Sequence, residues 1–316
     1  HSLKGLPVPR YDLNERNFIL NHSIQATRGC PFRCSFCSVM SLYPSLRVRP
    51  IDEVIRDIIC FEGRNYIQNK VVMFMDNNLI ANKKYAKELF RNMKPLKKWW
   101  WSQVSIDMAN DNELMKLAAE SGCLSVFIGI ETFSQESLNN IRKPQNKIAE
   151  YKRAIKSFHK HGIYVMAGLI IGFDEDTVES IRRIPDIVQE LDIDFRYLAI
   201  LTPNYGTEIF DQFDKEGRIL TKDWSLYNTF NAVFQPMNMS INDLHSSYLE
   251  ILSEIHSIPK TFSRISKNLP IPLSRFPSFL WKSLDNGYFM YRNLMGRYPL
   301  VGVNGEENSN MAEDAC

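Results

Sequence analysis

Cys30, Cys34 and Cys37 stand at C-x3-C-x2-C spacing in the segment IQATRGCPFRCSFCSVM. This segment offers three thiolates, whereas a structural zinc site or a simple ferredoxin cluster takes four protein ligands. A [4Fe–4S] cluster held by three cysteines leaves one iron open to another ligand. The triad therefore predicts a metal centre with one coordination position at which chemistry could occur.

The charges around the triad favour such a centre. Residues 16–51 contain no Asp or Glu but five arginines, Arg16, Arg28, Arg33, Arg47 and Arg49. Nearby guanidinium groups would favour thiolates and offset the negative charge of a thiolate-bound cluster. Two alternatives stay open. The cysteines could be ordinary buried residues on a basic loop, or they could form a zinc site that recruits His22 as its fourth ligand.

Length and composition indicate an ordinary globular protein. The 316 residues are 44% hydrophobic, enough for one large α/β domain with an appendage or for two small domains. A formal charge of +2 argues neither for nor against nucleic acid, and no apolar run approaches a membrane span. The other three cysteines are scattered, which disfavours a secreted disulfide framework and suggests a cytoplasmic protein. A chain that opens at His1 without a signal peptide suggests a fragment of a longer protein.

Short apolar runs alternate with segments of helical period from about residue 24 to 200. The predicted strands are 24–28, 71–75, 103–106, 125–131, 164–172 and 194–201, and amphipathic helices separate them. Such β–α steps indicate a parallel sheet with right-handed crossovers. The periodicity leaves a partial barrel and a doubly wound sheet both open. In either fold, functional residues gather at the carboxyl ends of the strands.

The domain boundaries follow from where this alternation stops. We expect an N-terminal linker at 1–20, a core at 21–201, a mostly helical C-terminal extension at 202–300 and a disordered tail at 301–316. Two aromatic features receive structural interpretations. Trp99, Trp100 and Trp101 are expected at a helix–strand junction. His159 is expected to be solvated or to interact with the dipole at the C-terminal end of its helix.

The pattern C-x3-C-x-Phe-C after the first strand of a β/α chain resembles the radical S-adenosylmethionine (SAM) superfamily, over roughly residues 20–200. The resemblance implies an α/β fold with a partial (β/α)6 barrel of the TIM type. It also implies a [4Fe–4S] cluster on the three cysteines, with SAM on the open iron. Reductive cleavage of SAM would give methionine and a 5′-deoxyadenosyl radical that abstracts hydrogen from a substrate. A flavodoxin or ferredoxin would supply the electron.

The resemblance also suggests roles around the first two strands. Phe36 would pack near the adenine, or it could anchor the loop. Asp76, Asn77 and Asn78 follow the second strand, where the family often has a Gly-Gly-Glu motif that binds the methionine amine. Because this chain has Asp-Asn-Asn there, the place carries over and the ligand does not. A turn and helix cap is the structural alternative for these three residues.

Further candidates end the later strands. Glu131 would bind the ribose hydroxyls, and a carboxylate on an apolar strand is costly to bury without a partner. Gly168 and Gly172 resemble the family's fifth-strand G-x-I-x-G motif, which brings backbone close to the adenine, although strand glycines can equally serve packing. Gln103 and Ser105 are expected to face the cavity.

A narrower resemblance is to the cobalamin-binding branch, carried by LPVPRYDL, TRGCPF, FMDNN, FIGIET and GFDED. Members of that branch methylate carbon or phosphorus, or rearrange and close rings. The chain has no room before residue 6 for a cobalamin domain and lacks a D-x-H-x-x-G loop, so cobalamin is expected only if an upstream domain exists. We expect a radical SAM enzyme acting on a small or lipid-like substrate, with methyl transfer as the leading second step. A cobalamin-independent oxidoreductase or cyclase, or a non-catalytic iron–sulfur protein, is the alternative.

Overall fold

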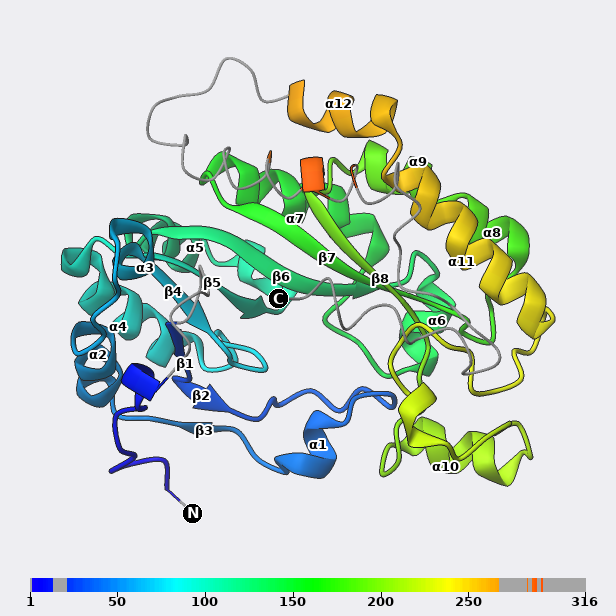
Figure 1. Ribbon diagram of the computed structural model, residues 1–316, viewed down its shortest axis with the longest axis horizontal. Helices are drawn as coiled ribbons and strands as arrows, with labels where there is room; N and C mark the ends of the chain where they lie inside the picture. Colours follow the sequence, from blue (N-terminus) through cyan, green and yellow to red (C-terminus); the bar gives the residue numbers. More distant parts are fainter. Residues whose placement is uncertain (1, 14–21, 267–282, 284–285, 289–290, 292–316) are drawn as a thin grey trace.

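The computed structural model describes residues 2–13, 22–266, 283, 286–288 and 291. The expected tail at 301–316, most of residues 267–300 of the expected extension and part of the expected linker lie outside these residues. At the centre is a sheet of six parallel strands, in the order β1 (Ser23–Ile24), β4 (Val71–Phe74), β5 (Trp99–Val104), β6 (Cys123–Glu131), β7 (Tyr164–Ile171) and β8 (Phe195–Ile200). Figure 1 shows this curved sheet running through the molecule.

The winding of the sheet distinguishes the two folds left open by the sequence. Strand order and chain order coincide, so each new strand joins the same edge. Right-handed crossovers then put the connecting helices on one face, as in a barrel, whereas the order reverses in a doubly wound sheet. Since β1 and β8 form the two edges, the barrel is partial. The expected partial (β/α)6 barrel is therefore confirmed.

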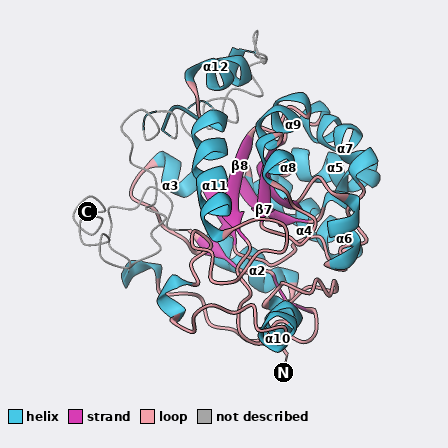
Figure 2. Cartoon of the chain, turned by 90° about the vertical axis from the view of Figure 1, so that its right-hand side faces the viewer, coloured by secondary structure: helices cyan, strands magenta, loops and turns pink. Residues whose placement is uncertain are grey.

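The crossover helices cover the outer face of the sheet. They are α2 (Ile51–Ile59), α4 (Lys83–Met93), α5 (Asn112–Glu120), α7 (Ile148–Lys160), α8 (Val178–Arg182) and α9 (Ile184–Glu190). Figure 2 shows them as an arc around the strands. Shorter elements join them: α1 (Val39–Leu42), α3 (Tyr66–Lys70), α6 (Gln135–Asn140), β2 (Thr27–Arg28), β3 (Arg47–Val48), and the 3-10 helices η1 (Tyr11–Leu13), η2 (Lys94–Leu96) and η3 (Ile106–Asn110).

The core lies between the sheet and these helices. Val72, Ile128 and Ala167 from the strands are fully buried, as are Leu89 of α4 and Ile155 of α7. β6, β7 and β8 are buried along most of their length, which is why they read as nearly continuous apolar runs. The packing of this layer sets the strand ends at which the functional residues stand.

Two strands differ from the sequence expectation. The first, predicted over 24–28, contributes only Ser23–Ile24 to the sheet, while Thr27–Arg28 pairs antiparallel with β3. The third, predicted to start at residue 103, starts at Trp99, so the tryptophans are strand residues and not a helix–strand junction. Trp100 is fully buried and donates from Nε1 to Ser121 Oγ at 3.0 Å. A buried hydrogen-bond acceptor makes an indole acceptable in the core.

His159 also differs from expectation. Its Nε2 lies 2.7 Å from Oδ2 of Asp194, which is fully buried and also accepts from the backbone N–H of Val165 at 2.8 Å. The ring is therefore not simply solvated at the end of α7. It satisfies a buried carboxylate that joins the start of β7 to the residue before β8.

Beyond β8 the chain forms α10 (Glu208–Lys215), the 3-10 helix η4 (Trp224–Leu226), α11 (Ile241–Ile255) and α12 (Ile258–Ser266). α11 packs on α8 and α9. Phe213 of α10 stacks on Phe234 with ring centroids 5.0 Å apart, and Arg218 binds Asp174, just past β7, at 2.6 Å. The Arg218–Asp174 pair ties the extension to the carboxyl end of β7. Among the described residues, no helix is long and apolar enough to cross a membrane.

Candidate functional site

The three cysteines share one cavity, which we call the cysteine cavity. It lies at the carboxyl ends of β4, β5 and β6, has a volume of about 120 Å³, and is lined by Cys30, Phe32, Cys34, Phe36, Cys37, Val39, Asn77, Asn78, Gln103, Val104, Ser105, Gly129, Glu131, Lys143, Gln145 and Asn146. Seven of the ten predicted site residues are in this set, together with Gln103 and Ser105. Asp76, Gly168 and Gly172 are not. Nine residues named from the sequence therefore lie together around one cavity.

Backbone hydrogen bonds hold the cysteine loop in place. Gly29, at φ +93°, donates from its N–H to Asn77 Oδ1 at 3.1 Å. Its missing Cβ would stand 2.5 Å from Ser45 O, so only glycine fits this turn. On the other side, Ser35 donates to Ile141 O at 3.0 Å and accepts from Ile209 N–H at 3.1 Å. The loop is therefore tied to the end of β4, to α6 and to the C-terminal extension.

Asp76 supports this loop instead of lining the cavity. It is buried, and its carboxylate accepts from the backbone N–H groups of Ala26, at 3.2 Å, and Thr27. Burial raises the pKa of Asp76 to about 6, against the lowering effect of these donors. Asn78, in contrast, reaches the cavity wall and exchanges two hydrogen bonds with Ser105, at 3.1 and 3.3 Å. Within the Asp-Asn-Asn turn, the amides are the cavity residues.

The thiols are largely buried, and one nearby positive charge offsets part of the effect of burial on their pKa values. Burial raises the pKa of Cys34 to about 11, and the positive charge of Lys143 lowers it in part. Burial also raises the pKa of Cys37. A thiolate in this cavity therefore needs a cation or a bound metal to stabilise it. The cation comes from Lys143, a residue that the sequence prediction missed.

Lys143 forms a buried ion pair with Glu131, from Nζ to Oε1. The lysine and glutamate side chains are only 11% and 9% exposed. Burial alone would lower the pKa of Lys143, but Glu131 and the thiol of Cys34 raise it above its ordinary value. No periodicity marks Lys143 in the sequence. The one available signal was that a buried Glu131 requires a partner.

The arginines near the cysteines do not supply the charge that we expected. Arg28 binds Gln25 Oε1 at 2.7 and 2.9 Å, and the buried Arg49 binds Asp57 at 2.8 Å. Neither lines the cysteine cavity, nor do Arg33 and Arg47, and Arg16 lies outside the described residues. Nearness in sequence was misleading for Arg28 and Arg49, because these side chains turn toward Gln25 and Asp57.

The two strand glycines have packing neighbours. A Cβ on Gly168 would stand 2.7 Å from the ring of Phe127. Gly172, at φ +99°, starts a turn in which Asp176 accepts from the N–H of Gly172 at 2.8 Å and from that of Phe173 at 3.1 Å. These contacts support the packing alternative for both glycines, and an approach of their backbone to adenine stays a prediction.

His22, the fourth ligand of the zinc alternative, lies elsewhere. Its ring stacks on Phe61, with centroids 4.0 Å apart and planes 9° apart, and meets the edge of Tyr11. It does not line the cysteine cavity. In the part of the chain that the structure describes, no three His, Cys, Asp or Glu side chains gather closely enough to hold one metal ion. The zinc alternative therefore loses the ligand on which it depended.

The side chains of the cysteine cavity suit a three-cysteine cluster with SAM. They comprise three sulfur ligands, the amide groups of Asn77 and Asn78, one carboxylate and the flat apolar ring of Phe36. SAM presents an amine, a ribose and an adenine, for which these groups are matching partners. The donor set thus fits the implied cofactors.

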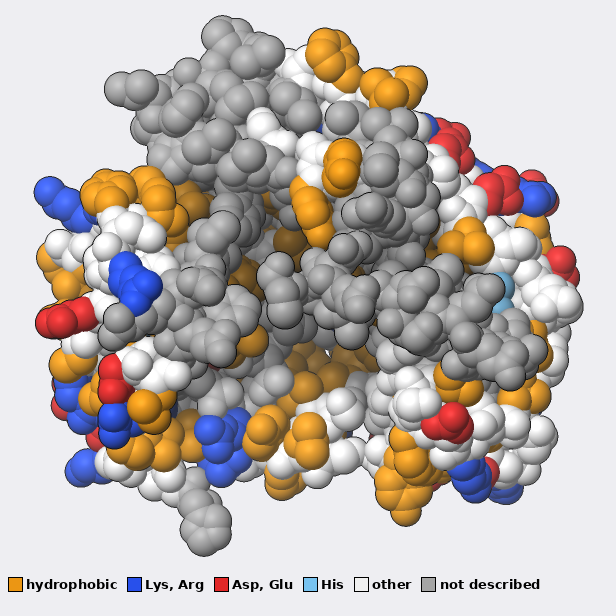
Figure 3. Space-filling model, viewed as in Figure 1, with side chains coloured by type: hydrophobic (Ala, Val, Ile, Leu, Met, Phe, Trp, Pro, Cys, Tyr) orange, Lys and Arg blue, Asp and Glu red, His pale blue; other side chains and the backbone are white. Residues whose placement is uncertain are grey.

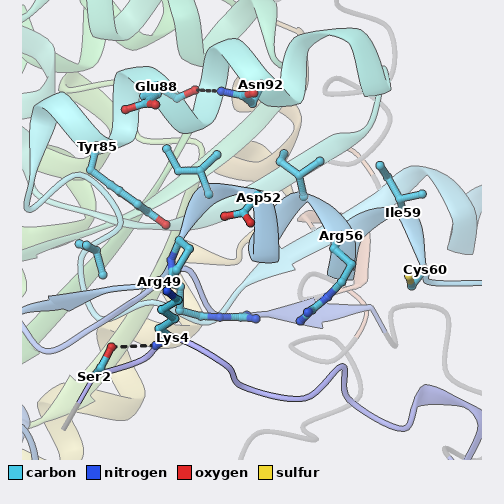
Figure 4. A pocket seen from close by; sticks show the side chains of 14 residues that line it. Ser2, Lys4, Arg49, Asp52, Arg56, Ile59, Cys60, Tyr85, Glu88 and Asn92 are labelled. Atoms are coloured by element: carbon cyan, nitrogen blue, oxygen red, sulfur yellow. Dashed lines mark hydrogen bonds between the residues drawn. The ribbon is translucent and has the colours of Figure 1, made fainter.

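A larger cavity of about 1090 Å³ lies between the N-terminal segment, α2 and α4. Figure 4 shows Tyr85, Glu88 and Asn92 of α4 facing Asp52 and Arg56 of α2. Its one cysteine, Cys60, has no second thiol beside it in the wall. Volume alone does not identify a reactive site, and the three cysteines lie together in the smaller cysteine cavity.

Comparison with known proteins identifies the family of this chain. A family model described as the radical SAM superfamily matches residues 24–187. The bacteriochlorophyllide d C-12(1)-methyltransferase of Chlorobaculum tepidum is 30% identical over 81% of this chain and 56% of its own length. The anaerobic magnesium-protoporphyrin IX monomethyl ester cyclase of Cereibacter sphaeroides is 26% identical over 69% of this chain and 36% of its own.

A solved structure shares the fold. TsrM from Kitasatospora setae, a radical SAM methyltransferase with cobalamin and a [4Fe-4S] cluster bound, aligns with a TM-score of 0.57 at 15% identity, over 87% of this chain and 61% of TsrM. The chain spans about half the length of the first curated relatives it matches. The family model covers more than half of the chain, and the chain therefore belongs to the radical SAM superfamily.

Proposed function

We propose that this chain is the core of a radical SAM enzyme in which Cys30, Cys34 and Cys37 hold a [4Fe–4S] cluster. When bound, the cluster and SAM supply an electron and a 5′-deoxyadenosyl radical that takes a hydrogen atom from the substrate. The observation that carries the proposal is the meeting of three cysteines in one cavity, with no further cysteine or histidine among its lining residues. An open coordination position is what SAM requires.

The chain's own residues bind and orient the cofactor in this proposal. Asn77 and Asn78 are the candidates for the methionine amine, Glu131 for the ribose hydroxyls and Phe36 for the adenine. Asn78 is held by Ser105 and Glu131 by Lys143, so both have fixed orientations. Such pre-organised groups restrict the bound cofactor to one geometry, which is how positioning lowers a reaction barrier.

For the net reaction we propose methyl transfer to a large apolar substrate, with ring closure as the second candidate. The relatives support this choice, since by their names they act on bacteriochlorophyllide d and magnesium-protoporphyrin IX monomethyl ester. Cobalamin enters the proposal only if a domain outside the present sequence provides it. We further propose a flavodoxin or ferredoxin as electron donor and a cytoplasmic location, because an iron–sulfur cluster needs a reducing compartment.

An aromatic group beside the cysteine loop supports a substrate of this kind. Tyr205, Phe210, Trp224 and Tyr227 contact one another with ring centroids 4.9 to 6.2 Å apart, and Tyr205 and Trp224 are 75% and 52% exposed. Figure 3 shows hydrophobic side chains reaching the surface beside α1 and α10. Exposed apolar patches next to a reactive site are typical of ligand contact.

The aromatic group belongs to the same rigid neighbourhood as the cysteines. Ser41, in α1, donates from Oγ to Gly206 O, and Ile209 N–H donates to Ser35 O. We therefore propose that residues 202–300 act as an extension that helps to bind the substrate, and that residues 21–201 hold the cluster and SAM.

Anaerobic reconstitution tests the proposal. Protein loaded with iron and sulfide is mixed with SAM and a strong reductant, and 5′-deoxyadenosine is measured by chromatography. We expect product from the native protein and none from the variant in which Cys30, Cys34 and Cys37 are all alanine. A fully loaded cluster that yields no 5′-deoxyadenosine would refute the radical reaction and favour the iron–sulfur binding or electron-transfer alternative.

A further inference from the structure

The end of β6 carries a bulge that sends Glu131 into the cysteine cavity. Gly129 pairs with Gly168 and Glu131 with Leu169, so Ile130 is an extra residue in β6. Glu131 itself has φ +65°, in the left-handed region that a residue with a Cβ rarely adopts. Strained backbone of this kind persists only where the surroundings hold it, and it gathers at functional sites.

The loop between α6 and α7 holds the bulge. Asn146, nearly fully buried, donates from Nδ2 to Gly129 O at 3.0 Å and to Ile130 O at 3.2 Å. The hydroxyl of Tyr151 donates to the same Ile130 carbonyl at 3.2 Å. The loop and the first turn of α7 therefore satisfy the irregular backbone, and the loop also delivers Lys143 to the carboxylate of Glu131.

Gly129 provides the space for this ion pair. A Cβ at Gly129 would stand 2.8 Å from Lys143 Nζ and still closer to Glu131 Oε1. Above the pair, Lys143 Nζ lies 5.9 Å from the centre of the Phe36 ring, a cation–π distance. The pair thus stands between the residue expected at the ribose and the loop that bears the cysteines.

A buried ion pair is weak evidence for stability, because desolvation of two charges can exceed their attraction. Here the pair also requires a bulge, a left-handed glutamate and an unsubstituted glycine. Among the residues that line the cysteine cavity, all of them described, Lys143 is the one cation and Glu131 the one carboxylate. Without Lys143, an ionised Glu131 would add negative charge beside three sulfurs.

We propose that Lys143 is a positioning residue with an electrostatic role. Its ammonium group orients the Glu131 carboxylate for the cofactor ribose, and its positive charge favours addition of an electron at the cysteine site. The inference rests on the proposed function and adds to it the residue that sets the charge of the cavity.

The test compares variants of the pair with a matched exposed pair. Lys143→Met, Glu131→Gln and the double variant are measured beside Lys147→Met. Lys147 is four residues further on, binds Glu150 at 3.8 Å and is 66% exposed. The readouts are SAM affinity by calorimetry, the midpoint potential of the loaded cluster, and thermal unfolding of the metal-free protein.

We expect Lys143→Met to weaken SAM binding roughly tenfold, the loss typical of one charge-assisted hydrogen bond. Its cluster should be harder to reduce, and a roughly tenfold change in the reduction equilibrium is about 59 mV for one electron. Glu131→Gln should shift the potential in the opposite direction, and the double variant should return near the native potential while still binding SAM weakly. For the potential, cancellation of the two opposite shifts in the double variant is the result expected of two opposite charges that act on one site. Lys147→Met should change none of these.

A Lys143→Met protein with native SAM affinity and native potential overturns the inference, even if it melts at a lower temperature, since the pair would then be structural only. If Lys143→Met does not load a cluster, the double variant decides, because it leaves no buried carboxylate without a partner. Native SAM affinity in the double variant would likewise overturn the inference. Failure of the proposed function looks different, because the native protein itself would then form no 5′-deoxyadenosine.

Discussion

Replacing His22 by phenylalanine should make the protein more resistant to acid and leave metal loading unchanged. The imidazole is 2% exposed and stacked on Phe61. Burial is the main cause that lowers the pKa of His22 to about 4, and the positive charge of Lys98 adds to it. A phenyl ring can fill the same place without a titrating group.

The size of the effect follows from proton linkage. Between pH 6.5 and about pH 4 the unfolded chain binds the proton and the folded protein does not, so the free energy of unfolding falls as the pH falls through this window. The resulting loss in the free energy of unfolding is about 2 kcal/mol at pH 5 and reaches about 3 kcal/mol below pH 4. Near pH 7.5 it vanishes, because both states are neutral.

Urea unfolding of the metal-free native and His22→Phe proteins at about pH 7.5 and about pH 5 measures this difference. Asp76 and Asp176, whose pKa values burial raises to about 6, also titrate here, but they do so in both proteins and cancel. We expect the variant to gain about 2 kcal/mol at the lower pH relative to the higher. If the variant and the native protein differ in unfolding free energy by the same amount at both pH values, the argument from burial of His22 is refuted. Loss of metal from the variant would revive the zinc alternative.

Three further predictions concern the loop, the turn and the surface. Asp76→Ala leaves two backbone N–H groups without their acceptor, so we expect a loss of about 1–3 kcal/mol in unfolding free energy and a lower iron content; native iron content would contradict its supporting role. Gly172→Ala should destabilise by about 1–2 kcal/mol, because φ is +99° and the added Cβ lies 3.2 Å from Leu244, yet calorimetry should find native SAM affinity; weaker SAM binding would favour the adenine role. Trp224→Ala should weaken binding of the flat apolar probe protoporphyrin IX, measured by fluorescence, whereas the exposed Tyr66→Ala control should not; equal effects would contradict a substrate role for the aromatic group.

The features that the sequence predicted correctly are local ones. Strands buried on both faces leave apolar runs that can be counted, and the cysteine spacing lies within one loop. The ends of α5 are also set by local contacts, since Asp111 caps the helix by accepting from Leu114 N–H at 3.0 Å and Gly122 follows it at φ +95°. Each of these signals is carried by residues a few positions apart.

What the sequence did not predict depends on contacts between distant segments. Lys143 meets Glu131 only because a bulge ends β6, and nothing in the strand's composition announces a bulge. Arg49 was expected near the cysteines but pairs with Asp57, since the direction of a side chain follows from tertiary packing. Asp76 was expected at the cofactor and instead holds the backbone of the loop beside it. Proximity in sequence to the cysteines indicated where the cavity lies, but it did not indicate which group each charged side chain binds.

Electron paramagnetic resonance of the anaerobically reconstituted and reduced protein, recorded with and without SAM, tests the central claim most directly. We predict the signal of a reduced [4Fe–4S] cluster, lost when Cys30, Cys34 and Cys37 are replaced by alanine, and changed in shape when SAM is added because SAM binds the open iron. A cluster whose signal ignores SAM, or a native protein that binds zinc and no iron, would contradict the account.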